Sequence, residues 1–132
     1  MKRVILLSIA LCALSAFASS HASESFEERV FLARDAEEDE RFHPYPAQVV
    51  REASPHIART MRSCWRQSPR NPKPFVLIAD IGPDGRPRNV EVKPAHASAR
   101  CFAAGFSAAR YLVPPEYPDR AGFPVTMRVG GN

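Results

Sequence analysis

The stretch from Val76 to Val92, VLIADIGPDGRPRNVEV, restricts the fold of this chain more than any other because it encodes an antiparallel hairpin. Its first half, within Phe75 to Ile81, is rich in aliphatic residues and is typical of a buried strand. Gly82 to Gly85 then supplies a proline with fixed φ, an aspartate acceptor and a glycine that tolerates positive φ, which together form a reverse turn. Val90 and Val92 alternate with polar residues, so we expect the second strand to expose one side to water.

Two helices and one more strand are predicted around this hairpin. The first helix is expected to begin at Ser54-Pro55, since serine is a favoured N-cap and proline suits the first helical position. The second is expected from Ser98 to Leu112, where small residues allow close packing against a sheet. Pro124 to Val129 is predicted as the closing strand. Its residues alternate between one face, with Val125, Met127 and Val129, and the other, with Thr126 and Arg128.

The order of these elements predicts an α+β fold. Helix, hairpin, helix and strand pack most simply in two layers, with a small three-stranded antiparallel sheet covered on one face by both helices. The apolar face of the first helix consists of Ile57, Met61, Cys64 and Trp65. We assign this domain to residues 54–132.

The start of the chain is typical of a secretory signal peptide. Residues 1–22 have a basic start, an apolar stretch too short to span a bilayer, and the small-x-small pattern Ser20-His21-Ala22. We therefore expect cleavage near residue 22, no stable membrane span afterwards, and a protein that is periplasmic or secreted.

An acidic segment, residues 23–53, follows the signal peptide. Ser25 and Glu28 form a capping-box pattern, which predicts a short, weakly docked helix. Pro44 and Pro46 are expected to stop it. A disordered linker is the alternative for this highly charged segment.

Two cysteines, Cys64 and Cys101, are left after removal of the signal peptide. In an exported chain two thiols most often form a disulfide, which here would join the two predicted helices. Two buried free thiols are the alternative. Zinc binding is disfavoured because the histidines have no ligand spacing with either cysteine.

Charge is segregated along the chain, whose formal net charge is +4. Residues 24–50 contain eight acids and three arginines, whereas the chain from Arg51 onward contains thirteen Lys/Arg and six acids. A basic surface suits nucleic acid, but an exported protein seldom meets any, so we expect no nucleic-acid partner. Anionic lipid, a cell-wall polymer and an acidic protein are the other partners that this excess suits.

No residue pattern points to catalysis, to a metal or to a cofactor. His56 and His96 could each pair with a cysteine, but a disulfide would remove that nucleophile. Asp84 is interpreted as the side-chain acceptor of the turn, and Asp80 as an exposed acid at a strand end. We therefore expect a protein that is not an enzyme and that binds no cofactor.

The order of these motifs resembles the C-terminal domain of TonB and its relatives. The matching features are the Asp84-Gly85 turn, the Val90–Val92 strand end, Arg110-Tyr111 and Pro114-Pro115, and the resemblance covers Ser54 to Val129. TonB itself has an uncleaved anchor and a long proline-rich spacer that this chain is not expected to have, so energy transduction is not implied.

The resemblance implies binding by strand addition. In that family an extended segment of a partner pairs with the sheet edge near the last strand, through backbone hydrogen bonds. Here that edge is Val125, Thr126, Met127, Arg128 and Val129, with Thr126 and Arg128 on the exposed side. The implied partner is an envelope protein or peptide segment, and two copies of the chain could also pair through this edge.

Two aromatic residues in a proline-rich loop, Tyr117 and Phe123, are further candidates for partner binding, whereas Trp65 is expected in the core. The alternative is that this loop folds back over its own core. The leading hypothesis is thus a periplasmic protein-binding module. The alternatives are a cationic protein that binds an anionic polymer or lipid surface, and an inhibitor or immunity protein of another exported protein.

Overall fold

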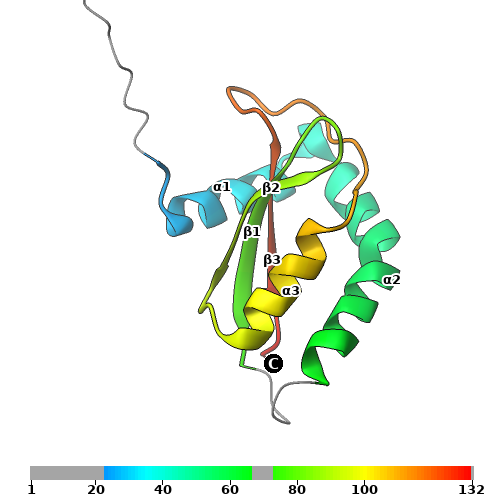
Figure 1. Ribbon diagram of the computed structural model, residues 1–132. Helices are drawn as coiled ribbons and strands as arrows, with labels where there is room; N and C mark the ends of the chain where they lie inside the picture. The colour runs from blue at the N-terminus through cyan, green and yellow to red at the C-terminus, as the bar shows by residue number, and fades with distance from the viewer. Residues whose placement is uncertain (1–22, 67–72, 132) are drawn as a thin grey trace, which may run out of the picture.

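The computed structural model describes residues 23–66 and 73–131, and the expected signal peptide, residues 1–22, lies outside them. The described part contains three α-helices, a short 3₁₀ helix and three strands (Figure 1). In chain order these are α1 (Phe26–Glu38), η1 (Glu40–Phe42), α2 (Tyr45–Trp65), β1 (Phe75–Ile81), β2 (Pro87–Lys93), α3 (Ala97–Ser107) and β3 (Phe123–Val129).

The three strands form one antiparallel sheet in the order β2-β1-β3. Ile78 at the centre of β1 lies opposite Glu91 of β2 and Thr126 of β3. The register of the hairpin shifts between Ile78 and Asp80, and Asn89 on the partner strand takes a positive φ of 52°. The predicted α+β fold with a small three-stranded antiparallel sheet is therefore confirmed.

The main core lies between the sheet and the two helices α2 and α3. Leu77 and Ile81 of β1 are fully buried there against Phe102 and Phe106 of α3. The predicted faces of β3 are correct, because Val129 is buried in this core and Val125 and Met127 pack against it. Both predicted helices thus cover one face of the sheet.

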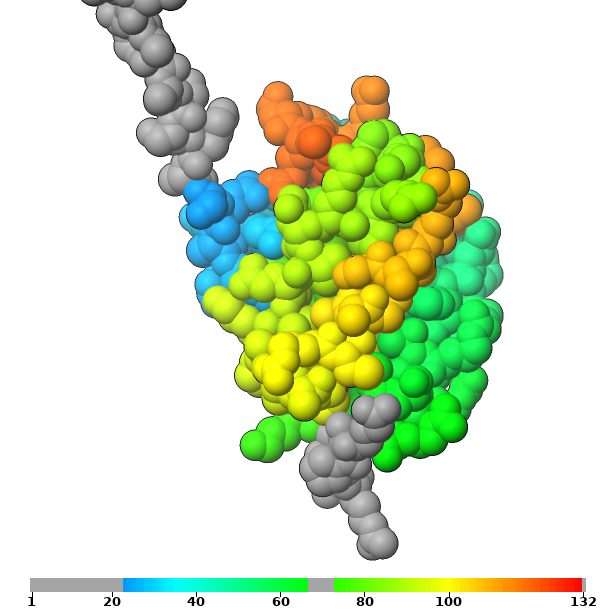
Figure 2. Space-filling view, in the orientation of Figure 1, coloured from blue at the N-terminus to red at the C-terminus, as the bar shows by residue number. Residues whose placement is uncertain are grey.

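The helix α1 is the helix predicted from the capping box, but it is firmly docked, not weakly, and it packs on the opposite side of the sheet from α3 (Figure 1). Its residues Ala33 and Ala36 are buried, and it contacts β3 more than any other strand. The predicted capping box is present, since Ser25 and Glu28 exchange hydrogen bonds at the helix start. In the space-filling view α1 and α2 form opposite flanks of the molecule (Figure 2).

The predicted start of α2 at Ser54 is wrong. The helix begins at Tyr45, and Ser54 lies inside it, with its hydroxyl donating to the carbonyl of Val50. Pro46 belongs to the first turn, where a missing N–H has no intrahelical partner to lose, so it starts this helix instead of stopping the one before. The expected boundary between residues 53 and 54 therefore falls inside a helix, as does Pro55.

The helix α3 ends at Ser107, earlier than the predicted Leu112. The chain turns away there, and Tyr111 forms its contacts outside the helix. Its N–H donates to the carbonyl of Gly85 in the hairpin turn, and its ring stacks on Phe106. Gly85 has a φ of 75°, and an added Cβ would lie 2.3 Å from the Tyr111 oxygen, so only glycine fits.

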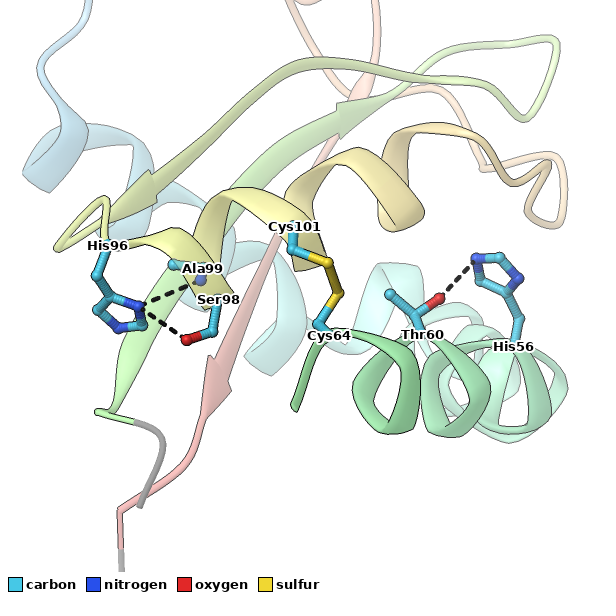
Figure 3. Close-up of a disulfide and its surroundings, with 7 residues drawn as sticks. All are labelled: His56, Thr60, Cys64, His96, Ser98, Ala99 and Cys101. Carbon is cyan, nitrogen blue, oxygen red and sulfur yellow. Dashed lines mark hydrogen bonds between the residues drawn. A yellow bond between two sulfur atoms is a disulfide. The ribbon is translucent and has the colours of Figure 1, made fainter. Parts of the chain in front are cut away.

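The predicted disulfide is present and joins α2 to α3 (Figure 3). The Cα atoms of Cys64 and Cys101 lie 5.7 Å apart, within the range that a disulfide spans. The bond closes a sequence separation of 37 residues across the helical layer.

Candidate functional site

The outer side of β3 is a free edge of the sheet. The N–H of Gly82 donates to the carbonyl of Arg86, so the backbone groups of Gly82 face β2. Because these groups alternate along a strand, the even-numbered residues of β1 direct theirs towards β2 and the odd-numbered residues towards β3. Because Leu77 lies opposite Met127, the peptide groups of Thr126 and Arg128 must point outward from the sheet. No backbone hydrogen bond between described residues uses these outward groups.

A groove runs along this edge between α1 and α2. Its volume is about 60 Å³. The groove is lined by Ala33 and Glu37 of α1, by Tyr45, Pro46, Val49 and Val50 of α2, by residues 123–127 of β3, and by Leu77 and Phe106 at its floor. The two helices therefore flank the unpaired strand from opposite faces of the sheet and leave its edge open between them.

The predicted edge residues differ in exposure. Arg128 is exposed, Val125, Thr126 and Met127 are partly buried, and Val129 is buried with its side chain in the main core. The hydroxyl of Thr126 donates to the carbonyl of Leu77 and so fixes the side chain on the α1 face. What this strand leaves unpaired along the groove is thus its backbone, and Thr126 is one of the lining residues.

The prediction of exposed aromatic anchors is wrong for Phe123, which is only 2% exposed. Its ring packs edge-on against Phe42 and Tyr45, residues of η1 and α2 that the sequence did not connect with this loop. Tyr117 is partly buried between Phe42 and Phe123. The loop thus folds back over the protein's own core, the alternative left open for it.

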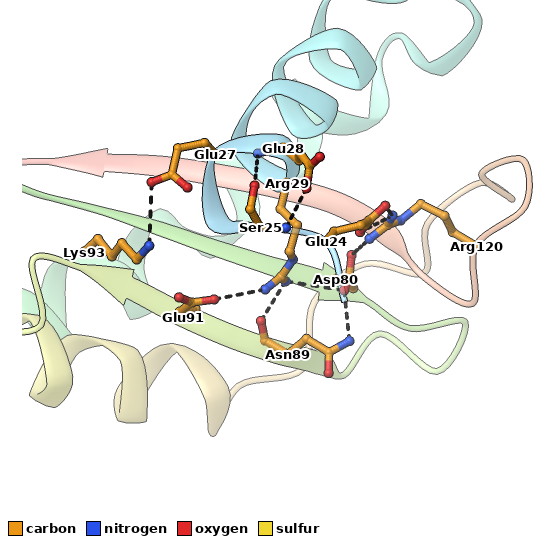
Figure 4. A network of polar contacts seen from close by, with 10 residues as sticks. All are labelled: Glu24, Ser25, Glu27, Glu28, Arg29, Asp80, Asn89, Glu91, Lys93 and Arg120. Atoms are coloured by element: carbon orange, nitrogen blue, oxygen red, sulfur yellow. Dashed lines mark hydrogen bonds and ion pairs between the residues drawn. The ribbon is translucent and has the colours of Figure 1, made fainter. Parts of the chain in front are cut away.

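A polar network, centred on Asp80, holds α1 against the sheet (Figure 4). The side chain of Asp80 was expected to be exposed, but it is buried, because it lies on the face that α1 covers. Its carboxylate binds Arg29 of α1 at 3.4 Å, Arg120 at 3.0 Å and the amide of Asn89 at 3.0 Å. Arg120 in turn binds Glu24 at 2.6 Å.

This network also positions the groove. The same helix that carries Arg29 carries Ala33 and Glu37, which form one wall of the groove. Arg29 and Arg120 lie far from Asp80 in the sequence, so the charge pattern alone could not predict that they bind its carboxylate. The capping box at Ser25 was the available signal that a helix exists there.

The histidines and cysteines form no catalytic pair among the described residues. The ring of His56 contacts the carbonyl of Gly105 at 2.9 Å, and His96 caps α3 by accepting from the Ala99 amide (Figure 3). Both cysteines are used in the disulfide. Asp84 accepts from the backbone N–H of Arg86, which lowers the pKa of its carboxyl, as expected for the acceptor of the turn.

Comparison with known proteins yields no relative for this chain: no family model, no curated protein and no solved structure matches it. None of the helices in residues 23–66 and 73–131 is both long enough and apolar enough to cross a bilayer.

Proposed function

We propose that this protein is an exported binding module of the bacterial cell envelope that captures an extended segment of a partner protein by strand addition to β3. The periplasm is the proposed location, and residues 1–22 are the proposed signal peptide. The order of motifs that resembles the TonB C-terminal domain supports this role. The disulfide between Cys64 and Cys101 suits an oxidising compartment.

The observation that carries the proposal is the open edge of β3 inside an apolar groove. An unpaired strand edge can accept another strand through its free backbone groups. Here Val49 and Val50 of α2 extend beside the edge without bonding to it. Backbone groups of Thr126 and Arg128 then supply affinity, while the groove walls supply selectivity.

A proline variant tests this role. Thr126→Pro removes an outward N–H that lines the groove, and Pro124 shows that this strand already accepts proline at a residue of the same orientation. The matched control is Thr126→Val, which keeps the amide and the branched shape. Cross-linking pull-down from an envelope extract should recover the partner with the wild type and the valine variant and lose it with the proline variant. Capture by a folded proline variant would refute strand addition.

A second candidate function is binding of an anionic polymer or lipid surface, and one observation favours it. Four arginines, Arg51, Arg59, Arg62 and Arg66, are exposed along α2 and its C-cap. Helical geometry places them within about 80° of arc, on the side opposite the buried Cys64. No ion pair between described residues neutralises them.

Salt separates the two candidates. The screening length falls from about 10 Å at 0.1 M salt to about 3 Å at 1 M, so polymer or lipid binding through the four arginines should weaken steeply. The affinity of strand addition should change little with salt. Reversing Arg59 and Arg62 to glutamate should abolish binding to vesicles that contain phosphatidylglycerol and leave partner capture by β3 unchanged.

A further inference from the structure

We propose that the segment captured by β3 carries an aliphatic residue directly beside a lysine or arginine. This inference rests on the proposed function, because it assumes an added strand, and it names the chemistry that the groove selects. It follows from the different character of the two groove walls.

Neighbouring side chains of an added strand point to opposite walls. Successive residues of a strand alternate between the faces of the sheet, and a residue directly opposite another shares its face. A partner residue opposite Val125 therefore points towards α2 and the main core. The next residue lies beside Thr126 and points towards α1.

The α2 wall is apolar and small. Leu77 and Phe106 form its floor, and Val49 lies on its side. The whole groove has a volume of about 60 Å³, which is less than the roughly 150 Å³ of an apolar cavity known to take benzene. A valine, leucine or isoleucine side chain fits this space better than an aromatic ring, so the wall selects an aliphatic residue.

The α1 wall carries one carboxylate. Glu37 is the only charged residue that lines the groove among the described residues, and no described cation forms an ion pair with it. Glu37 is exposed and lines the groove together with Thr126 of β3. A lysine or arginine of the partner beside Thr126 can lay its aliphatic stem along this wall and place its cation at Glu37.

Selection from a displayed library of random decapeptides tests this signature. The target is the protein purified after export, as wild type, Glu37→Lys and Glu38→Lys. Lysine in the last turn of α1 is compatible with the helix dipole, so both variants should fold. Glu38 is exposed and does not line the groove, which makes Glu38→Lys the matched control.

The wild type and Glu38→Lys should enrich peptides with a valine, leucine or isoleucine next to a lysine or arginine. Glu37→Lys should instead enrich an acidic residue at that position and bind the wild-type peptides about fivefold to tenfold more weakly. Peptides that lack this pair, or aromatic residues in place of the aliphatic one, would overturn the inference.

The same peptides separate this inference from the proposed function. If they bind the wild type but not Thr126→Pro and show no such pair, strand addition stands and the inference fails. If they bind a folded Thr126→Pro equally well, or if no peptide is enriched at all, the proposed function fails and the inference with it.

Discussion

The Nη2 atom of Arg120 lies 3.0 Å from Oδ1 of Asp80 and so ties the loop before β3 to the end of the central strand β1. The other nitrogen, Nη1, binds Glu24 just before α1, and Arg29 of α1 binds the second oxygen of Asp80. One buried carboxylate therefore holds both the loop that leads into β3 and the helix that forms one wall of the groove.

Replacing Asp80 by alanine should destabilise the protein strongly. The change leaves Arg29 and Arg120, each mostly buried, without their shared carboxylate, and breaking such a pair costs about 3 kcal/mol. The measurement is the free energy of unfolding from urea denaturation. Glu38→Ala on the exposed surface of α1 is the control and should change stability by less than about 0.5 kcal/mol. Equal free energies of unfolding for the two variants would contradict a stabilising role of the Asp80 network.

Removing the disulfide should also destabilise the protein. In the chain-entropy account a bridge across 37 residues contributes about 3–4 kcal/mol, a large part of a small domain's stability. The double variant Cys64→Ala/Cys101→Ala should unfold at correspondingly lower denaturant concentration. A thiol assay on the unreduced protein after export checks the bond itself: no free Cys64 or Cys101 thiol is expected, and two reactive thiols would contradict it.

Gly105→Ala should destabilise the contact between α3 and α2. A Cβ at this position would lie 2.4 Å from Cγ2 of the buried Thr60, so one side of this contact must shift. We expect a loss of about 1–3 kcal/mol. Thr60→Ala removes the clashing atom, so the double variant should recover part of this loss. A double-mutant cycle from thermal unfolding measures the coupling, and strictly additive effects would be inconsistent with this contact.

The first turn of α1 should loosen in acid. Hydrogen bonds from the backbone N–H and then from the hydroxyl of Ser25 lower the pKa of Glu28 from its ordinary value of 4.5. The charged carboxylate is therefore favoured by folding. Its contribution is fully present above pH 4.5 and is lost as the pH falls through the lowered pKa. The protection of the Ser25 and Glu28 amides, measured relative to the intrinsic exchange rate at each pH, should fall in that window and stay constant between pH 5 and 7.

Glu28→Gln is the control for this titration. Glutamine cannot ionise, so the pH-dependent part of the protection at the start of α1 should disappear. The difference between wild type and variant isolates the contribution of Glu28. An identical pH profile in the two proteins would show that the capping box does not control the helix start.

Local chemistry in the sequence was enough to predict the hairpin, the closing strand and the disulfide. The turn from Gly82 to Gly85 has few alternative conformations, and the alternation of residues 123–129 leaves one way to bury Val129. Prolines were harder to interpret. Pro46 can end one helix or begin the next, and the apolar positions before Ser54 were too few to decide between these.

The candidate site depended on contacts that no local pattern contains. Asp80 looks like a strand-end acid until α1 brings Arg29 onto it from the other face of the sheet. Phe123 looks exposed in a loop until Phe42 and Tyr45 cover it. In each case the missing information was the position of the acidic N-terminal segment in space, although the capping box had predicted a helix there.

Amide hydrogen exchange of β3 tests the central claim most directly, because strand addition must protect the outward N–H groups and not the inward ones. NMR exchange rates should be measured for Thr126, Arg128, Val125 and Met127, with and without a peptide obtained by the selection. We predict that the peptide slows exchange at Thr126 and Arg128 by at least about tenfold and leaves the amides of Val125 and Met127, already bonded to β1, almost unchanged. Binding that leaves the Thr126 and Arg128 amides unprotected would contradict the claim.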